Sequence, residues 1–294
     1  MRSIGAKAEQ LSYRLIDAGW AQSQDDEPEL LYHYTSSAGL QGILSNKNIL
    51  LTERRFMNDV SESLLGKEII LSIINSRIKS SNDSKIRNFY EKLLKSFISP
   101  AQNNFIFSLS DKGDDLTQWR SYASDGEGFA IAFDVAAIKN RSATNEFGFG
   151  KILYNRSSYV SKINNAIDSF VSMYDELNDE DSVKWIPEIV LECDATIDAI
   201  ACAYKHSSFR SEREWRINRY PDEESEIRIR ESKNKLIPNI AINLGHEEHP
   251  IGIKRIGIGP GFKDPSIRYA VEILCKNAGL SVEIYNADTP YRRL

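Results

Sequence analysis

The group of charged side chains richest in possible chemistry lies at Glu212, Glu214 and Arg216. On a strand, alternate residues share one face, so these three side chains would converge, while Arg213 and Trp215 would face the other way. A carboxylate fixed in a water-poor cleft stabilises developing positive charge better than bulk water does, and a second carboxylate can accept a proton. The alternative interpretation is a solvent-exposed sheet face that carries salt bridges.

Three other segments carry groups that could take part in a site. His33 lies near the end of a short β-prone run just before a helix, where it is either a ligand or a histidine bonded to backbone. Ser108 and Ser110 are two apart on a predicted strand, so their hydroxyls share one side, either lining a site or entering a polar turn. Tyr122 is three residues from Trp119 on a short helix, which predicts either a core pair or a flat platform for a ring.

Asn58, Asp59 and Glu62 precede or open a predicted helix. Asp59 and Glu62 have the spacing of a capping box, and acidic residues in a first turn also suit the helix dipole. We favour that structural interpretation, with a position of Asn58 or Asp59 in the site as the alternative.

Several familiar sites are excluded by spacing. The histidines of His246–His249 are three apart before a proline, whereas a zincin helix needs them four apart, so we predict no metal site. Gly257–Gly261 lacks the acidic residue that follows a dinucleotide-binding turn. A phosphate-binding loop lysine and a nucleophile elbow are also absent from the sequence.

Composition indicates a folded globular protein of 294 residues. Lysine and arginine total 37 against 42 acidic residues, a net charge of −5, so no overall basic field favours a nucleic-acid coat. Three scattered cysteines do not make a disulfide framework. The apolar run Ile69–Ile74 is far shorter than the ~20 residues of a membrane span. We therefore expect a cytoplasmic protein with no membrane partner.

Hydrophobic periodicity predicts an α+β fold, because strands arrive in clusters separated by pairs of helices. Helices are expected at residues 3–21, 60–79, 84–98, 116–122 and, in two pieces, 157–204, with another after Asp264. Thr35 or Ser36 is expected to cap a further helix that carries Leu40, Ile43 and Leu44. Strands are expected at residues 30–34, 49–52, 104–109, 128–133, 214–218, 226–230, 236–244, 254–258 and 282–285. We expect residues 1–29 to be a helical appendage with a linker. Residues 30–294 would then form a single domain with helical insertions near 60–99 and 157–204.

A resemblance to the bacterial family called domain of unknown function 2971 runs from about Leu31 to the C-terminus. It is carried by a succession of short blocks, namely Phe56–Asp59 with Glu62, Phe107–Ser110, Trp119 with Tyr122, Gly128–Asp134, Glu212–Arg216 and Gly259–Pro260. The family name implies no activity.

The segment Leu31–Thr35 followed by a helix ending in Ile43-Leu44 also resembles, more distantly, the opening motif of the ADP-ribosyltransferase fold. That resemblance implies a central split β-sheet and NAD as substrate, with His33 at the adenosine ribose. Tyr34 stands where the family has a glycine that holds the nicotinamide amide, and Thr35 completes the motif.

The same resemblance implies roles for residues further along the chain. Ser108 corresponds to a Ser-x-Ser strand that braces the site, and the Glu212/Glu214 pair to a Glu-x-Glu motif. Glu214 would then be the catalytic residue, and Glu212 would activate the acceptor. Among the remaining side chains, Tyr122 is a candidate to stack on a ring, and the guanidinium of Arg210 or Arg216 suits the NAD pyrophosphate.

The function expected from this resemblance is NAD-dependent ADP-ribosyl transfer to a protein or nucleic-acid acceptor, or NAD hydrolysis, in a bacterial toxin or phage-defence context. Two alternatives remain open. One is a catalytically silent binding module of a defence system, and the other is an enzyme that processes nucleotides or RNA ends.

Overall fold

The structure is a computed structural model that describes residues 3–20, 27–57, 60–99, 103–143, 147–221, 226–232, 234–245 and 252–291. For residues 60–64 it gives the helix without the side chains. Asn58, Asp59 and His246–His249 lie outside the described residues, as does the side chain of Glu62.

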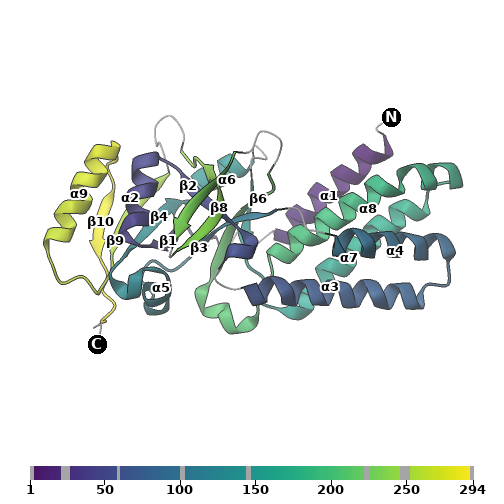
Figure 1. Cartoon of the computed structure of the whole chain (residues 1–294), viewed down its shortest axis with the longest axis horizontal. Coiled ribbons are helices and arrows are strands. Elements are labelled where there is room, and N and C mark those ends of the chain that lie inside the picture. The colour runs from purple at the N-terminus through teal and green to yellow at the C-terminus, as the bar shows by residue number, and fades with distance from the viewer. Residues whose placement is uncertain are drawn as a thin grey trace. The chain divides into compact units, whose positions relative to one another are not determined.

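The chain divides into two compact units, each assembled from segments distant in sequence (Figure 1). The helical unit comprises Met1–Ala21, Asn58–Gln102 and Lys151–Arg210. The sheet unit comprises Gln22–Met57, Asn103–Gly150 and Ser211–Leu294. The appendage and the two helical insertions expected from the sequence therefore belong together in one unit.

The helical unit has its own apolar core. Its helices are α1 (Ile4–Trp20), α3 (Val60–Ser80), α4 (Ser84–Ile98), α7 (Arg156–Asp175) and α8 (Asp179–Cys202). In α4, Phe89, Leu93 and Phe97 recur at helical spacing and are buried, and Asp83 caps the first turn by accepting from two backbone N–H groups. These apolar faces pack against buried residues of α3, α7 and α8.

In the described part of the chain, ten strands form one open sheet of mixed direction, so the fold is mixed α/β. Its strands are β1 (Leu30–Thr35), β2 (Ile49–Glu53), β3 (Phe105–Ser110), β4 (Phe129–Asp134), β5 (Gly148–Lys151), β6 (Glu214–Arg219), β7 (Ile227–Ser232), β8 (Lys235–Ile242), β9 (Ile253–Ile258) and β10 (Glu283–Asn286). The main path runs β10-β9-β4-β1-β3-β2-β8-β7, and β6 pairs with β3 and β5. Only β9 and β10 are parallel among the registered pairs of described strands.

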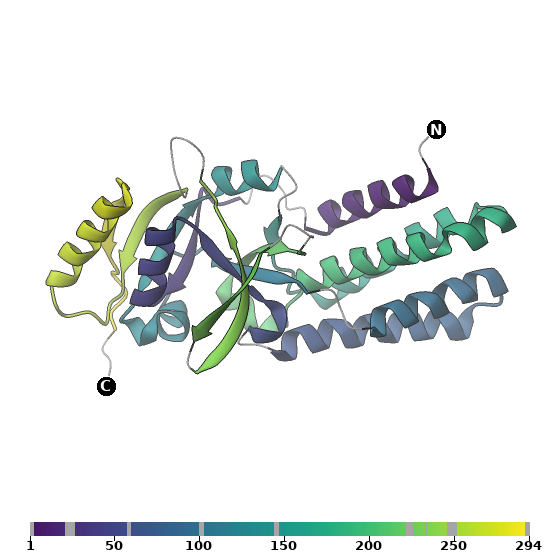
Figure 2. The ribbon, with the colours of Figure 1, turned by 45° about the horizontal axis from the view of Figure 1, so that its top comes forward.

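The sheet splits at β3. Strand β6 pairs with β3 along its whole length, from Phe105 to Ser110. Since a strand has two edges, β1 and β2 share the other one. Strand β1 pairs at Ser110, and β2 pairs at Phe105 and Ile106. The two strands thus diverge beside the middle of β3, and Figure 2 shows how strongly the sheet twists around this point.

Strand alternation gives the sheet two different faces. The core face carries Leu31, Phe107, Leu109 and Trp215, which are buried in the main apolar cluster. Helices α2 (Ser37–Asn46), α6 (Val135–Ser142) and α9 (Ser266–Ala278) contribute their apolar sides to that cluster. The polar face carries Ser108, Ser110, Glu214 and Arg216, and α5 (Leu116–Tyr122) packs against β1 on this side through Trp119.

The predicted strands and helices all occur, with ends that shift by one or two residues. Apart from three short 3-10 helices, two of the described elements were not predicted. The short helix α6 begins directly at the end of β4, where Asp134 caps it. Strand β5 contains two glycines, which are poor strand formers, but a Cβ at Gly148 would lie 2.4 Å from Oδ1 of Asn218. A larger residue at position 148 would therefore have to displace the Asn218 side chain.

No helix among the described residues is both long and apolar enough to cross a lipid bilayer.

Candidate functional site

The carboxylate of Glu214 is the centre of the polar face. Its Oε1 accepts hydrogen bonds from Ser108 Oγ at 2.7 Å and Arg216 Nε at 2.7 Å. Its Oε2 accepts from an Arg216 terminal nitrogen at 3.1 Å, which completes a two-pronged contact. The Glu214 side chain is 5% exposed and that of Arg216 is 8% exposed, so the ion pair is enclosed by protein.

Strand register explains why these residues meet. Ser108 lies opposite Arg216 and Ser110 lies opposite Glu214 in the β3–β6 pair, so all four point to the polar face. Leu109 and Trp215 alternate with them and face the core. The two-residue spacing predicts the shared face of Ser108 with Ser110 and of Glu214 with Arg216, and the strand pairing joins the two pairs.

Glu212 does not belong to that strand face, so the prediction that it shares the face of Glu214 and Arg216 is wrong. Strand β6 begins at Glu214, and Arg213 has a left-handed backbone with φ of 48°. Arg213 is held there by its ion pair with Asp111 at 2.6 Å. The break in the strand turns Glu212 toward α5, where its Oε1 accepts a hydrogen bond from the Tyr122 hydroxyl at 2.9 Å.

Tyr122 therefore contacts Glu212 through its hydroxyl. Its side chain is one-third exposed. Asp115 fixes the start of α5 by accepting from the backbone N–H groups of Thr117 and Gln118. The glycine turn after α5 is also tightly packed, because a Cβ at Gly128 would lie 2.4 Å from the carbonyl oxygen of Thr35.

His33 lies beside the split. Its ring stacks on Phe107 with 4.1 Å between centroids, and its Nδ1 lies 3.0 Å from the carbonyl oxygen of Ser108. Because a carbonyl can only accept, Nδ1 carries the proton. Burial lowers the pKa of His33 to about 4, the bond to Ser108 opposes that shift, and the charge of Arg230 lowers the pKa further. The ring is thus neutral at physiological pH, and Nε2 is a hydrogen-bond acceptor.

His33 and Glu214 are not side by side on one face of the sheet. His33 pairs with Ile131 of β4 and lies two residues after buried Leu31. Its side chain therefore points to the core face, as that of Leu31 does. The resemblance implies that His33 and Glu214 line one NAD site, but the His33 side chain does not face the side of the sheet that carries Glu214. Ser108 links the other two instead, since its carbonyl oxygen binds His33 and its hydroxyl binds Glu214.

Tyr34 and Thr35, predicted to contact NAD, are engaged in packing. Tyr34 is 5% exposed, sits edge-on to Trp119, donates from its hydroxyl to the carbonyl of Lys112 and accepts from the N–H of Asp115. The Thr35 side chain occupies the space above Gly39, where an added Cβ would lie 1.9 Å from its hydroxyl oxygen. Both residues hold the segments around β1 in place.

The two arginines predicted for a pyrophosphate are placed differently. The Arg216 guanidinium is committed to Glu214. Arg210 is exposed and is the last residue of the helical unit. A third arginine, Arg230 of β7, was not predicted, although the alternation Ile227-Arg228-Ile229-Arg230 could have indicated it. Arg230 is half-buried and donates to the Thr52 hydroxyl at 3.2 Å.

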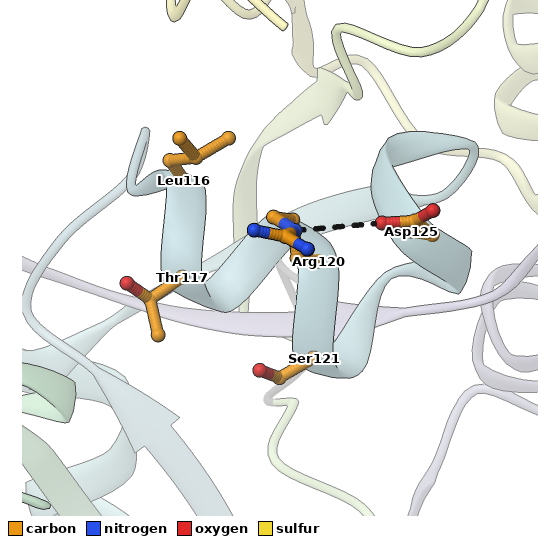
Figure 3. Close-up of a pocket in the computed structure, with 5 residues that line it drawn as sticks. All are labelled: Leu116, Thr117, Arg120, Ser121 and Asp125. Atoms are coloured by element: carbon orange, nitrogen blue, oxygen red, sulfur yellow. Dashed lines mark ion pairs between the residues drawn. The ribbon is translucent and has the colours of Figure 1, made fainter. Parts of the chain in front are cut away.

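A surface hollow of about 330 Å³ lies on α5 and the short turn after it (Figure 3). Leu116, Thr117, Arg120 and Ser121 come from α5, and Asp125 lies 3.7 Å from Arg120 across the hollow. None of the residues predicted for the site lines it. Among the described residues, no three histidine, cysteine or acidic side chains gather as metal ligands.

Comparison with known proteins gives one match. No curated protein and no solved structure matches the chain. Residues 118–217 match the model of a family described as protein of unknown function, DUF2971. This range contains Tyr122, Glu212, Glu214 and Arg216. The match over residues 118–217 agrees with the resemblance to this family that the blocks in the sequence indicate.

Proposed function

We propose that this protein catalyses NAD-dependent transfer of ADP-ribose to a macromolecular acceptor, or to water, with Glu214 as the catalytic carboxylate. The observation that carries the proposal is the enclosure of Glu214 between the Ser108 hydroxyl and the Arg216 guanidinium. Burying an ionised carboxylate is costly, and here a matched set of donors holds it in one orientation. Such a preorganised anion is what a reaction that develops positive charge requires.

The reaction breaks the bond between the nicotinamide nitrogen and C1 of the ribose. The bonding electrons leave with nicotinamide, which is released neutral, and positive charge spreads over the ribose carbon and ring oxygen. Glu214 stabilises that charge. A lone pair of the acceptor then forms the new bond to C1, and the acceptor loses one proton.

Glu212 is placed to receive that proton. Its carboxylate is partly exposed and is oriented by the Tyr122 hydroxyl. It therefore remains accessible, whereas Glu214 is enclosed. This division assigns charge stabilisation to Glu214 and acceptor activation to Glu212.

We leave His33 outside the proposed site, because its ring packs on Phe107 and faces the core, opposite the sheet face of Glu214.

The direct test is incubation of the wild-type protein with NAD, with and without protein or nucleic-acid acceptors, while nicotinamide release is measured. We expect release that depends on the protein, and ADP-ribose on an acceptor or in solution. Absence of both NAD binding and nicotinamide release under every acceptor condition would overturn the proposal and favour a silent binding module. Processing of an RNA end without nicotinamide release would favour the nucleotide-processing alternative.

A further inference from the structure

Arg230 is a half-buried cation without an acidic partner. Its one contact in the described part of the chain is the hydrogen bond from a terminal nitrogen to the neutral Thr52 hydroxyl at 3.2 Å. Its Nε is enclosed and has no acceptor among the described residues. Burial lowers the pKa of Arg230, and no described carboxylate opposes that shift. An uncompensated charge in this setting destabilises the folded state.

Arg228, two residues earlier on the same strand, provides the contrast. It is half-exposed and donates to Glu226 at 2.7 Å. Alternation on β7 puts Arg228 and Arg230 on the same face of the sheet. The same strand therefore carries a solvated arginine with an acidic partner and a half-buried arginine without one among the described residues, so strand composition alone does not account for Arg230.

The sheet register places Arg230 on the polar face with Glu214. Arg228 pairs with Asn239 of β8, Asn239 pairs with Thr52 of β2, and Thr52 pairs with Ile106 of β3. Ile106 is two residues before Ser108, so the hydroxyls of Thr52 and Ser108 belong to one polar face. The charge of Arg230 also reaches His33 at the split, where it lowers the pKa of the ring.

We propose that Arg230 and Thr52 form a phosphate subsite for a nucleoside diphosphate, on the same sheet face as Ser108 and Glu214. The inference rests on the proposed function for its choice of nucleotide. The planar guanidinium can present two N–H groups to a phosphate, and the Thr52 hydroxyl can rotate to donate as well. A bound anion would supply the compensating charge that Arg230 lacks. Arg230 would then bind the pyrophosphate, the role predicted from the sequence for Arg210 or Arg216.

Calorimetric titration of the full-length protein with ADP, inorganic pyrophosphate and adenosine tests the subsite. We expect Arg230→Gln to weaken ADP binding by at least about tenfold, since charge-assisted bonds to phosphate are lost. Adenosine affinity should not change. Arg228→Gln, the matched control on the same strand, should bind ADP like the wild type. Equal ADP affinity in Arg230→Gln and wild type, or wild-type binding of ADP no tighter than adenosine, would overturn the subsite.

Thermal unfolding without ligand separates this role from a structural one. A bracing arginine would lower the melting temperature when removed, whereas Arg230→Gln should leave it unchanged or raise it, because an uncompensated charge disappears. A clear fall in melting temperature would contradict the inference. If Arg230→Gln does not fold, Arg230→Lys and Thr52→Val carry the titration, each with weaker ADP binding expected.

The subsite and the transferase proposal can fail independently. Arg230-dependent ADP binding by a protein that releases no nicotinamide would reject the transferase and keep the phosphate subsite. Nicotinamide release that is unaffected by Arg230→Gln at limiting NAD would keep the transferase and reject the phosphate subsite. Binding of pyrophosphate as tight as that of ADP would reject a site specific for a nucleoside diphosphate.

Discussion

The helical unit and the sheet unit each hold an arginine in a network of hydrogen bonds, but the two networks have different surroundings. In the helical unit, Arg77 of α3 donates to Tyr90 of α4 and to Asn164 and Asp168 of α7. Its acidic partner is 59% exposed, and the network joins three helices. In the sheet unit, Arg216 and Glu214 are enclosed on adjacent positions of one strand face, and Ser108 of β3 donates to Glu214 of β6.

This difference indicates that Arg77 has a structural role, whereas the Glu214–Arg216 pair is a candidate for catalysis. Arg77 joins three helices through its side chain, and its carboxylate partner is exposed to solvent. The β3–β6 pair is already held by its ladder and by the core face, so the fold gains little from a buried ion pair there. A carboxylate kept ionised at such a cost is a better candidate for a function than the exposed one.

The largest effect should come from breaking the buried pair on one side. Arg216→Met leaves Glu214 enclosed without its partner, so the free energy of unfolding should fall by about 3–5 kcal/mol in urea titrations. Replacing both residues, as in Glu214→Leu with Arg216→Met, should recover most of that loss. A loss below about 1 kcal/mol in the single variant would mean that the pair is solvated.

The stability of the sheet unit should depend on His33 between pH 6.5 and 4. The unfolded state binds a proton near pH 6.5, whereas the folded state does so only near pH 4, so stability is full above 6.5 and falls with pH across this window. The loss should approach about 3 kcal/mol. His33→Gln should remove this part of the pH dependence, whereas the exposed control His206→Gln should keep it. An unchanged slope in His33→Gln would contradict the burial of the ring.

Arg77→Leu should cost less than Arg216→Met, because its partner Asp168 can be solvated when the guanidinium is gone. We expect a loss of about 1–2 kcal/mol in urea unfolding. Lys79→Met, at an exposed position near the end of the same helix, should change stability by less than about 0.5 kcal/mol. A cost for Arg77→Leu equal to that for Arg216→Met would remove the distinction between the two networks.

The smallest effects on stability should come from helix caps, which occur in both units. Asp83→Ala at α4 and Asp115→Ala at α5 each remove a carboxylate that accepts from two backbone N–H groups, at about 1 kcal/mol each. Only Asp115→Ala should also slow nicotinamide release, since α5 positions Tyr122 against Glu212. Equal release rates in the two variants would leave Tyr122 without a role.

Local pattern was sufficient for much of the fold and for the centre of the site. Alternation predicted that Ser108 shares a strand face with Ser110, and that Glu214 shares one with Arg216. The β3–β6 register brings Ser108 and Glu214 into contact. The elements that escaped prediction are α6 and β5, whose formation depends on the capping carboxylate of Asp134 and on the approach of Asn218. Hydrophobic periodicity, on which the prediction of these elements was based, indicates neither feature.

The errors in the site arise from long-range geometry. His33 faces the core because of its register with β4, and no local pattern records which strand will be its neighbour. Glu212 leaves the strand face because Arg213 takes a left-handed backbone that its ion pair with Asp111 supports. Arg230 reaches Thr52 across a gap of 178 residues in sequence. Such contacts depend on which distant segments of the chain meet in the tertiary structure, so they could not be predicted from a single sequence.

The most direct test of the central claim is nicotinamide release by Glu214→Gln beside a matched buried control. Glu53→Gln alters another enclosed carboxylate that pairs with an arginine, Arg55, on the core-face side of β2. If Glu214 stabilises the ribosyl cation, Glu214→Gln should bind NAD normally but release nicotinamide at least ~10²-fold more slowly, and folded Glu53→Gln should retain the wild-type rate. Equal rates in Glu214→Gln and wild type would contradict the account.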